Sequence, residues 1–162
     1  MLPEVIMCAW LVSGYPVGID KEIALLTCGE IAVRATEVKE DPALLIALAY
    51  HESRLNPNAI SKSKARGPLQ VMPKQCKRWR RAGSPLKKAD SPTVWRKCDL
   101  IAAGIWTWMR WRTKSKSERQ AVCRYNAGYR CKKNTKSWRW AGAVVSLAKK
   151  LRSIDYKIEV VK

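Results

Sequence analysis

The sequence predicts a mainly α-helical protein that folds as one domain. Apolar residues recur mostly at the three- and four-residue spacing of helices, and β-branched alternation is scarce outside residues 154–161. Helix-capping residues precede several of these periodic stretches. The chain has 162 residues, of which 47% are hydrophobic and 28% charged, and this composition excludes a disordered or collagen-like chain.

The N-terminal region is expected to contribute to the core and to a first helix. Residues 5–12 are apolar, but the stretch is short and no basic residue precedes it, so we interpret it as core rather than as a signal peptide. No apolar run approaches the ~20 residues that a membrane-spanning helix needs. The pattern then predicts a helix from residues 19–20 to about residue 39, capped by Asp20.

The second helix has clear boundaries. Asp41 supplies an acceptor at the cap, and Pro42 suits the first turn, where its missing N–H is not needed. Residues 43–53 carry the helix, and Asn56 followed by Pro57 closes it.

The remaining elements are predicted from helix-breaking residues and from the periodicity of apolar residues. After a polar loop over residues 58–67, a short segment over 68–72 is expected to stop at Pro73, and Gly83, Pro85 and Pro92 break the basic residues 74–97 into short pieces. Further helices are predicted over residues 98–112, 117–125 and 138–151. We expect one domain over 1–162, with a helical N-terminal region (1–40), a core (41–151) and a C-terminal tail (152–162).

The charge is distributed very unevenly. Residues 1–60 hold four Lys/Arg and eight Asp/Glu, whereas residues 61–162 hold 28 Lys/Arg and five Asp/Glu. A positive field over one part of the surface favours an anionic partner. Nucleic acid, anionic lipid and the acidic polymers of a bacterial envelope all qualify, and charge alone does not choose among them.

Six cysteines indicate disulfides more than a metal site. No CxxC pair occurs and His51 is the only histidine, so the sequence predicts no structural zinc site. An even number of cysteines suits disulfides formed in an oxidising compartment. The alternative is that all six are reduced thiols in the core. Six cysteines allow 15 pairings. Spacing favours Cys123–Cys131, with Cys76–Cys98 and Cys8–Cys28 as weaker candidates.

Glu52 stands out as a candidate general acid. In the second predicted helix it shares a face with Leu45, Leu48 and Ala49. Desolvation on an apolar face raises the pKa of a carboxyl, and so does the negative end of a helix dipole. A carboxyl that holds its proton near neutral pH can protonate the oxygen of a leaving sugar.

Four motifs around Glu52 resemble those of the soluble lytic transglycosylases, which share a core with goose-type lysozyme. They are residues 52–61 (ESRLNPNAIS), 65–73 (ARGPLQVMP), 99–104 (DLIAAG) and 124–128 (RYNAG). The resemblance spans about residues 30–145. It implies a lysozyme-like domain of several helices around a substrate groove, with residues 41–151 as its catalytic core. The chain departs from the family where Lys64 replaces a usual glycine and Pro68-Leu69 replaces Leu-Met.

The resemblance also implies roles for individual residues. Glu52 would be the single catalytic acid/base, with the Tyr125 hydroxyl close to it. Ser61, Gln70, Met72, Tyr125 and Asn126 would line the groove that binds peptidoglycan glycan strands, and neither a metal nor an organic cofactor is implied. The expected reaction cleaves the β-1,4 bond between N-acetylmuramic acid and N-acetylglucosamine and leaves a 1,6-anhydro end.

Three alternatives stay open. A two-carboxylate glycosidase needs a second acid, and after Glu52 the next ones are Asp90 and Asp99, either of which could orient a water for lysozyme-like hydrolysis. Seven of the eight tryptophans lie in the basic part, which also suits base stacking in a nucleic-acid-binding module. The third alternative is a structural part of a phage particle or of a secretion apparatus. An enzyme acting at the cell wall or periplasm would reach it in a phage particle, by holin-type release or through a secretion apparatus.

Overall fold

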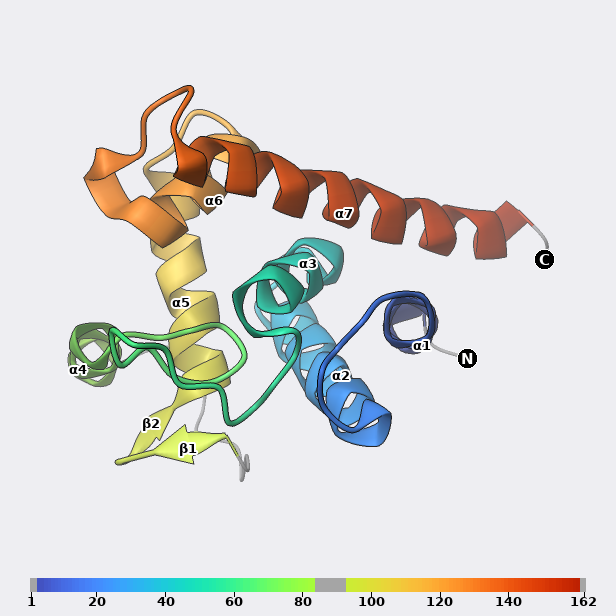
Figure 1. Ribbon diagram of the computed structural model, residues 1–162, viewed down its shortest axis with the longest axis horizontal. Coiled ribbons are helices and arrows are strands. Elements are labelled where there is room, and N and C mark those ends of the chain that lie inside the picture. Colours follow the sequence, from blue (N-terminus) through green and yellow to red (C-terminus); the bar gives the residue numbers. More distant parts are fainter. Residues whose placement is uncertain (1–2, 84–92, 161–162) are drawn as a thin grey trace.

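A computed structural model describes residues 3–83 and 93–160, with side chains described as far as Ile154. These residues form seven α-helices and one small hairpin (Figure 1). The helices are α1 (Pro3–Gly14), α2 (Lys21–Glu37), α3 (Pro42–Ser53), α4 (Pro73–Ala82), α5 (Leu100–Thr113), α6 (Glu118–Ala127) and α7 (Lys136–Val160). The hairpin pairs β1 (Val94–Trp95) with β2 (Cys98–Asp99), and a short 3-10 turn, η1 (Gly128–Arg130), follows α6. The mainly α-helical fold predicted from the sequence is confirmed.

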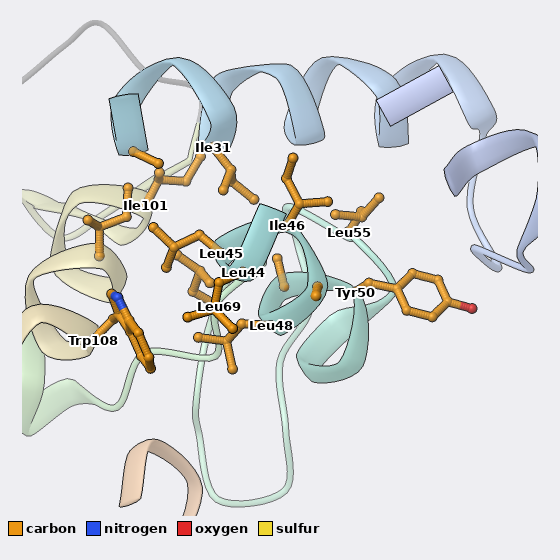
Figure 2. Packing of buried hydrophobic residues seen from close by; sticks show 14 of the residues in the cluster. Ile31, Leu44, Leu45, Ile46, Leu48, Tyr50, Leu55, Leu69, Ile101 and Trp108 are labelled. Atoms are coloured by element: carbon orange, nitrogen blue, oxygen red, sulfur yellow. The ribbon is translucent and has the colours of Figure 1, made fainter. Parts of the chain in front are cut away.

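α3 is the central helix. Eight consecutive residues, 43–50, are buried, so it is covered on all sides rather than along one stripe. It packs against α2 on one side and α7 on another, and the long α7 also contacts α1 and α6 (Figure 1). Figure 2 shows Leu45 and Leu48 among side chains from α2, α5 and the loop after α3.

The predicted caps of the first helices are present. The Asp20 carboxylate accepts hydrogen bonds from the N–H groups of Glu22 and Ile23 at the start of α2. The Asp41 carboxylate accepts one from the Ala43 N–H, with Pro42 in the first turn of α3. These contacts lie within three residues of the cap, which is why the sequence predicts them.

Three expectations about the other elements need correction. Pro73 starts α4 instead of stopping a segment, because proline fits the first helical turn as well as a break, and Cys76 and Trp79 bury one side of the new helix. The hairpin β1–β2 was not expected. The last helix runs to Val160 instead of ending at residue 151. Pro85 and Pro92 lie outside the described residues.

The N-terminal apolar stretch is buried in part, and Val5 and Trp10 within it are exposed. Within α1, Met7, Cys8, Leu11 and Val12 are buried. A disulfide joins Cys8 to Cys28 of α2, with an S–S distance of 2.03 Å. No helix among the described residues is long and apolar enough to cross a membrane.

All three cysteine pairs favoured by spacing are formed. Cys76–Cys98 joins α4 to β2, and Cys123–Cys131 joins α6 to the residue after η1. The described cysteines therefore include no free thiol. The last bridge spans Tyr125 and Asn126, so it holds the end of α6 and the following turn together.

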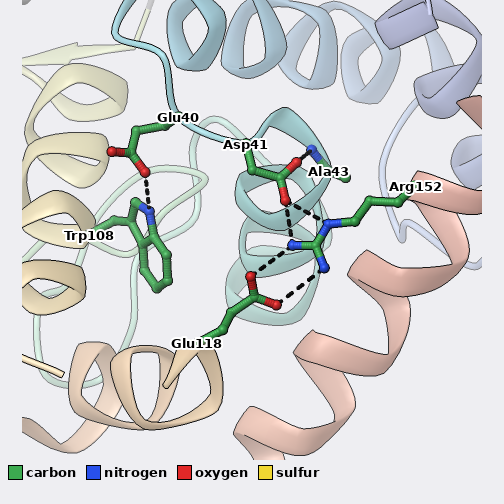
Figure 3. Close-up of polar contacts among 6 residues, drawn as sticks. All are labelled: Glu40, Asp41, Ala43, Trp108, Glu118 and Arg152. Carbon is green, nitrogen blue, oxygen red and sulfur yellow. Dashed lines mark hydrogen bonds and ion pairs between the residues drawn. The ribbon is translucent and has the colours of Figure 1, made fainter. Parts of the chain in front are cut away.

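Charged and polar side chains tie distant helices together (Figure 3). Glu40 accepts a hydrogen bond from the Trp108 indole at 2.9 Å and contacts the Arg112 guanidinium at 2.7 Å. The Arg152 guanidinium of α7 bridges Asp41 and Glu118. These contacts fasten α7 and α5 to the segment that starts α3, which is the helix that carries Glu52.

Candidate active site

Glu52 lies in the last turn of α3, and its side chain is only partly exposed. The three apolar residues that share its face in the sequence pattern (Leu45, Leu48 and Ala49) are fully buried. Burial raises the pKa of Glu52 from 4.5 to about 8. At neutral pH the carboxyl therefore carries a proton, and no carboxylate partner is needed to explain this, because desolvation alone disfavours the charged form.

Tyr125 of α6 lies near enough to Glu52 for the two groups to interact electrostatically. Burial raises the pKa of Tyr125 well above its ordinary value, and the charge of Glu52 adds to this effect. The Tyr125 hydroxyl donates a hydrogen bond to the Leu69 carbonyl at 2.6 Å, across 56 residues of sequence. This bond connects α6 to the loop after α3, so it holds the phenol oxygen in one place.

His51, the preceding residue on α3, is neutral at pH 7. Burial lowers its pKa, and the positive charge of Arg54 lowers it further. The Arg54 guanidinium lies over the Tyr50 ring at 4.4 Å. The imidazole therefore brings no positive charge next to Glu52 that would lower the pKa of the carboxyl.

The loop between α3 and α4 is anchored at the Glu52 end. The Ser53 hydroxyl donates to the Pro68 carbonyl at 2.8 Å, and the backbones of Arg66 and Val71 pair in both directions. Lys64 has φ +68°, in the left-handed region that favours glycine. The chain thus keeps the backbone conformation of a glycine where the resemblance would place one.

Ser61 and Gln70 serve the loop's own hydrogen bonds. The Ser61 hydroxyl oxygen accepts from the Ala65 N–H at 3.0 Å, which closes a turn. The Gln70 amide donates to the Gly67 carbonyl at 2.9 Å. Both side chains are partly exposed. Their assignment to a sugar-binding groove stays a prediction.

Met72, Tyr125 and Asn126 come together in one pocket of about 480 Å³. The Asn126 side-chain oxygen accepts a hydrogen bond from the Ser137 hydroxyl at 2.9 Å, and Asn126 is exposed. Glu52, Ser61 and Gln70 do not line this pocket. Of the six predicted residues, three therefore lie in the pocket and three lie outside it.

The pocket contains cations that the sequence analysis did not single out. Its lining includes Lys74, Arg78, Arg110, Lys114, Arg124 and Arg130, together with the aromatic rings of Trp111 and Tyr129. Their abundance in the basic part of the chain was visible in the sequence. Their convergence from α4, α5 and α6 required the tertiary structure.

Asp99, one of the two carboxyls considered as a second acid for hydrolysis, is engaged in structural contacts. Its side chain is fully buried, where it caps α5 by accepting from the Ala102 N–H and pairs with Arg34, whose Nη1 lies 2.7 Å from Oδ2. Glu118, the next described carboxylate along the chain, pairs with Arg152. Asp90, the other candidate, lies outside the described residues. Among residues 3–83 and 93–154, no three His, Cys, Asp or Glu side chains are grouped as a metal site would require.

Comparison with known families agrees with this arrangement. The family model described as the transglycosylase SLT domain matches residues 31–142, more than half of the chain. The chain belongs to the SLT transglycosylase family. The match contains Glu52, the loop after α3, α4, α5 and Tyr125. No curated protein matches the chain.

Membership of the SLT family establishes a coarse activity. The family carries out lytic-transglycosylase-type cleavage of peptidoglycan, which is a cell-wall substrate. The matched region begins inside α2 and ends inside α7. In this SLT protein, α1, the first part of α2 and most of α7 therefore lie outside the matched region, and all three helices pack against α3.

Proposed function

We propose that this protein is a peptidoglycan lytic transglycosylase in which Glu52 is the only catalytic acid and base. One observation carries the proposal. Glu52 combines a burial-raised pKa of about 8 with a position beside Tyr125 in an SLT domain. A general acid works best when its pKa lies near the working pH.

The reaction needs only one carboxyl. Protonated Glu52 donates its proton to the oxygen of the bond between N-acetylmuramic acid and N-acetylglucosamine, and that bond breaks. The resulting carboxylate then accepts the proton of the C6 hydroxyl of N-acetylmuramic acid while O6 bonds to C1. Glu52 is protonated again, no water is consumed, and one product ends in a 1,6-anhydro ring.

Neighbouring residues support this cycle. The Tyr125 hydroxyl, with its pKa raised, stays protonated while Glu52 changes charge, and its donation to Leu69 keeps the ring in place. Ser61, Gln70, Met72 and Asn126 are proposed to bind the acetamido groups and ring hydroxyls. In this proposal Asn126 and Met72 act from the pocket, and Ser61 and Gln70 act from the loop.

The product tests the proposal directly. Digestion of purified sacculi should release muropeptides with 1,6-anhydro-N-acetylmuramic ends, each lighter by one water than the hydrolytic product. Mass spectrometry of the digest separates the two. A digest with reducing ends alone would mean hydrolysis, and Asp90→Asn would then be the next variant to assay.

The pH profile follows from the raised pKa. Because the first step needs protonated Glu52, kcat/KM should stay level through neutral pH and fall by about tenfold per pH unit above about 8. Initial rates on soluble glycan strands between pH 5 and 10 would show this. A fall that begins near pH 5 would mean that Glu52 is ionised at neutral pH and is not the acid.

A further inference from the structure

The turn that contains Leu69 lies directly against α5. Gly104 of α5 has no side chain, and a Cβ atom placed there would lie 2.6 Å from both Cβ and Cδ1 of Leu69. Leu100, on the same face of α5, approaches Gly67 in the same way, because a Cβ atom on Gly67 would lie 2.9 Å from the Leu100 Cδ1. The turn over residues 67–70 therefore rests on one face of α5, at a distance that requires a glycine at each contact.

The contact at Gly104 is one that rotation of a side chain cannot relieve. The Cβ atom of Leu69 moves only with its backbone, and Leu69 is fully buried (Figure 2). Because non-bonded carbon atoms pack at about 3.5–4.0 Å, an alanine at position 104 would displace Leu69 or α5 by about 1 Å. The missing side chain of Gly104 therefore sets how closely the Leu69 backbone approaches α5.

The same stretch of backbone connects α3 to α6. The Leu69 carbonyl accepts a hydrogen bond from the Tyr125 hydroxyl of α6 at 2.6 Å. The preceding carbonyl, that of Pro68, accepts one from the Ser53 hydroxyl at 2.8 Å, and Ser53 directly follows Glu52 on α3. Two adjacent carbonyls thus connect the helix of the proposed acid to the helix of Tyr125, and both carbonyls move if the turn moves on α5.

We infer that Gly104 is a positioning residue for catalysis: its missing side chain lets the turn rest on α5 at the depth that places the Tyr125 hydroxyl relative to Glu52. This inference rests on the proposed function of Glu52. Gly104 is buried and acts through Leu69 and Tyr125. The electrostatic interaction between Glu52 and Tyr125 depends on the distance between them. A displacement of about 1 Å that originates away from the chemistry can lower a rate by about 10²-fold.

A double-mutant cycle between Gly104→Ala and Tyr125→Phe tests the inference. Gly104→Ala should lower kcat for the cleavage of soluble glycan strands by about 10- to 100-fold, with KM changed by less than about threefold. Tyr125→Phe lacks the hydroxyl that Leu69 holds, so adding Gly104→Ala to it should lower kcat further by less than about threefold. Equal losses of kcat in the two backgrounds, or a loss expressed in KM alone, would overturn the inference.

Gly29→Ala is the matched control, because it makes the same change within α2, where an added Cβ atom meets nothing within 4 Å. It should keep the wild-type kcat and be at least as stable as the wild-type protein, since alanine suits a helix better than glycine. Circular dichroism verifies that the variants fold. If Gly104→Ala does not fold, Gly67→Ala moves the same turn from its contact with Leu100 and takes its place in the cycle. Failure of both variants to fold would contradict the inference, because the contact would then serve the whole fold.

Urea unfolding of the same variants separates this inference from the proposed function. Gly104→Ala should lower the unfolding midpoint more in the wild-type background than in Tyr125→Phe, because only the wild-type background has the hydrogen bond from Tyr125 to Leu69 to lose. A wild-type protein that does not cleave peptidoglycan would contradict the proposed function, and the difference between the two midpoint shifts would still be expected. Equal shifts of the midpoint would mean that Gly104 does not set the position of the Tyr125 hydroxyl.

Discussion

Glu52→Gln is expected to reduce turnover of purified peptidoglycan by on the order of 10²–10⁴-fold, because the amide can neither donate the proton to the leaving oxygen nor accept one from the C6 hydroxyl. Release of soluble muropeptides, followed by chromatography, measures the effect. Glu22→Gln, which changes an exposed carboxylate on α2, is the matched control and should retain wild-type turnover. Wild-type turnover by Glu52→Gln would remove Glu52 from the mechanism.

The stability of the same variant is expected to show that the loss of turnover is chemical and does not come from unfolding. The pKa of Glu52 is about 8 in the folded protein, whereas the ordinary pKa of a glutamate, which applies to the unfolded chain, is 4.5. Between pH 4.5 and pH 8 the folded state therefore binds a proton that the unfolded state has already released. The free energy of unfolding of the wild-type protein should therefore fall as the pH rises from about 4.5 to 8. Glu52→Gln lacks this contribution, and it should be at least as stable as the wild-type protein at pH 8.

Arg34→Met is expected to lower the free energy of unfolding by about 3–5 kcal/mol at pH 7, because it leaves the buried Asp99 carboxylate without its cation. Arg34 and Asp99 are both almost inaccessible, so water cannot replace the lost contact. Urea unfolding followed by circular dichroism measures the change. The effect should exceed that of most single substitutions, which lie at about 0.5–3 kcal/mol.

The double variant Arg34→Met/Asp99→Asn separates charge from packing. Asparagine still accepts the Ala102 N–H and caps α5, but it carries no charge. The double variant should therefore recover a large part of the lost stability. No recovery, or a loss below about 1 kcal/mol for Arg34→Met alone, would mean that the pair does not stabilise the fold through its charges.

Local chemistry explains which features could be predicted from the sequence alone. Asp20 and Asp41 cap their helices through backbone N–H groups two or three residues away, so residue type and position suffice to predict them. The face shared by Glu52 and Leu48 follows equally from helical geometry. α4 was missed because Pro73 suits both the end of a segment and the first turn of a helix, and burial of Trp79 favours the second.

The sequence by itself determined the mainly α-helical fold, the family and Glu52 as a candidate acid, because helical periodicity, each family motif and the face that carries Glu52 are local features of the chain. Only the tertiary structure decided the position of Asp99, which is buried and paired with Arg34 across 65 residues. It also decided that Tyr125 is hydrogen-bonded to Leu69, and that cations from three helices converge on one pocket. Contacts of this kind depend on how helices pack, and packing is set by the whole core rather than by any local spacing of residues.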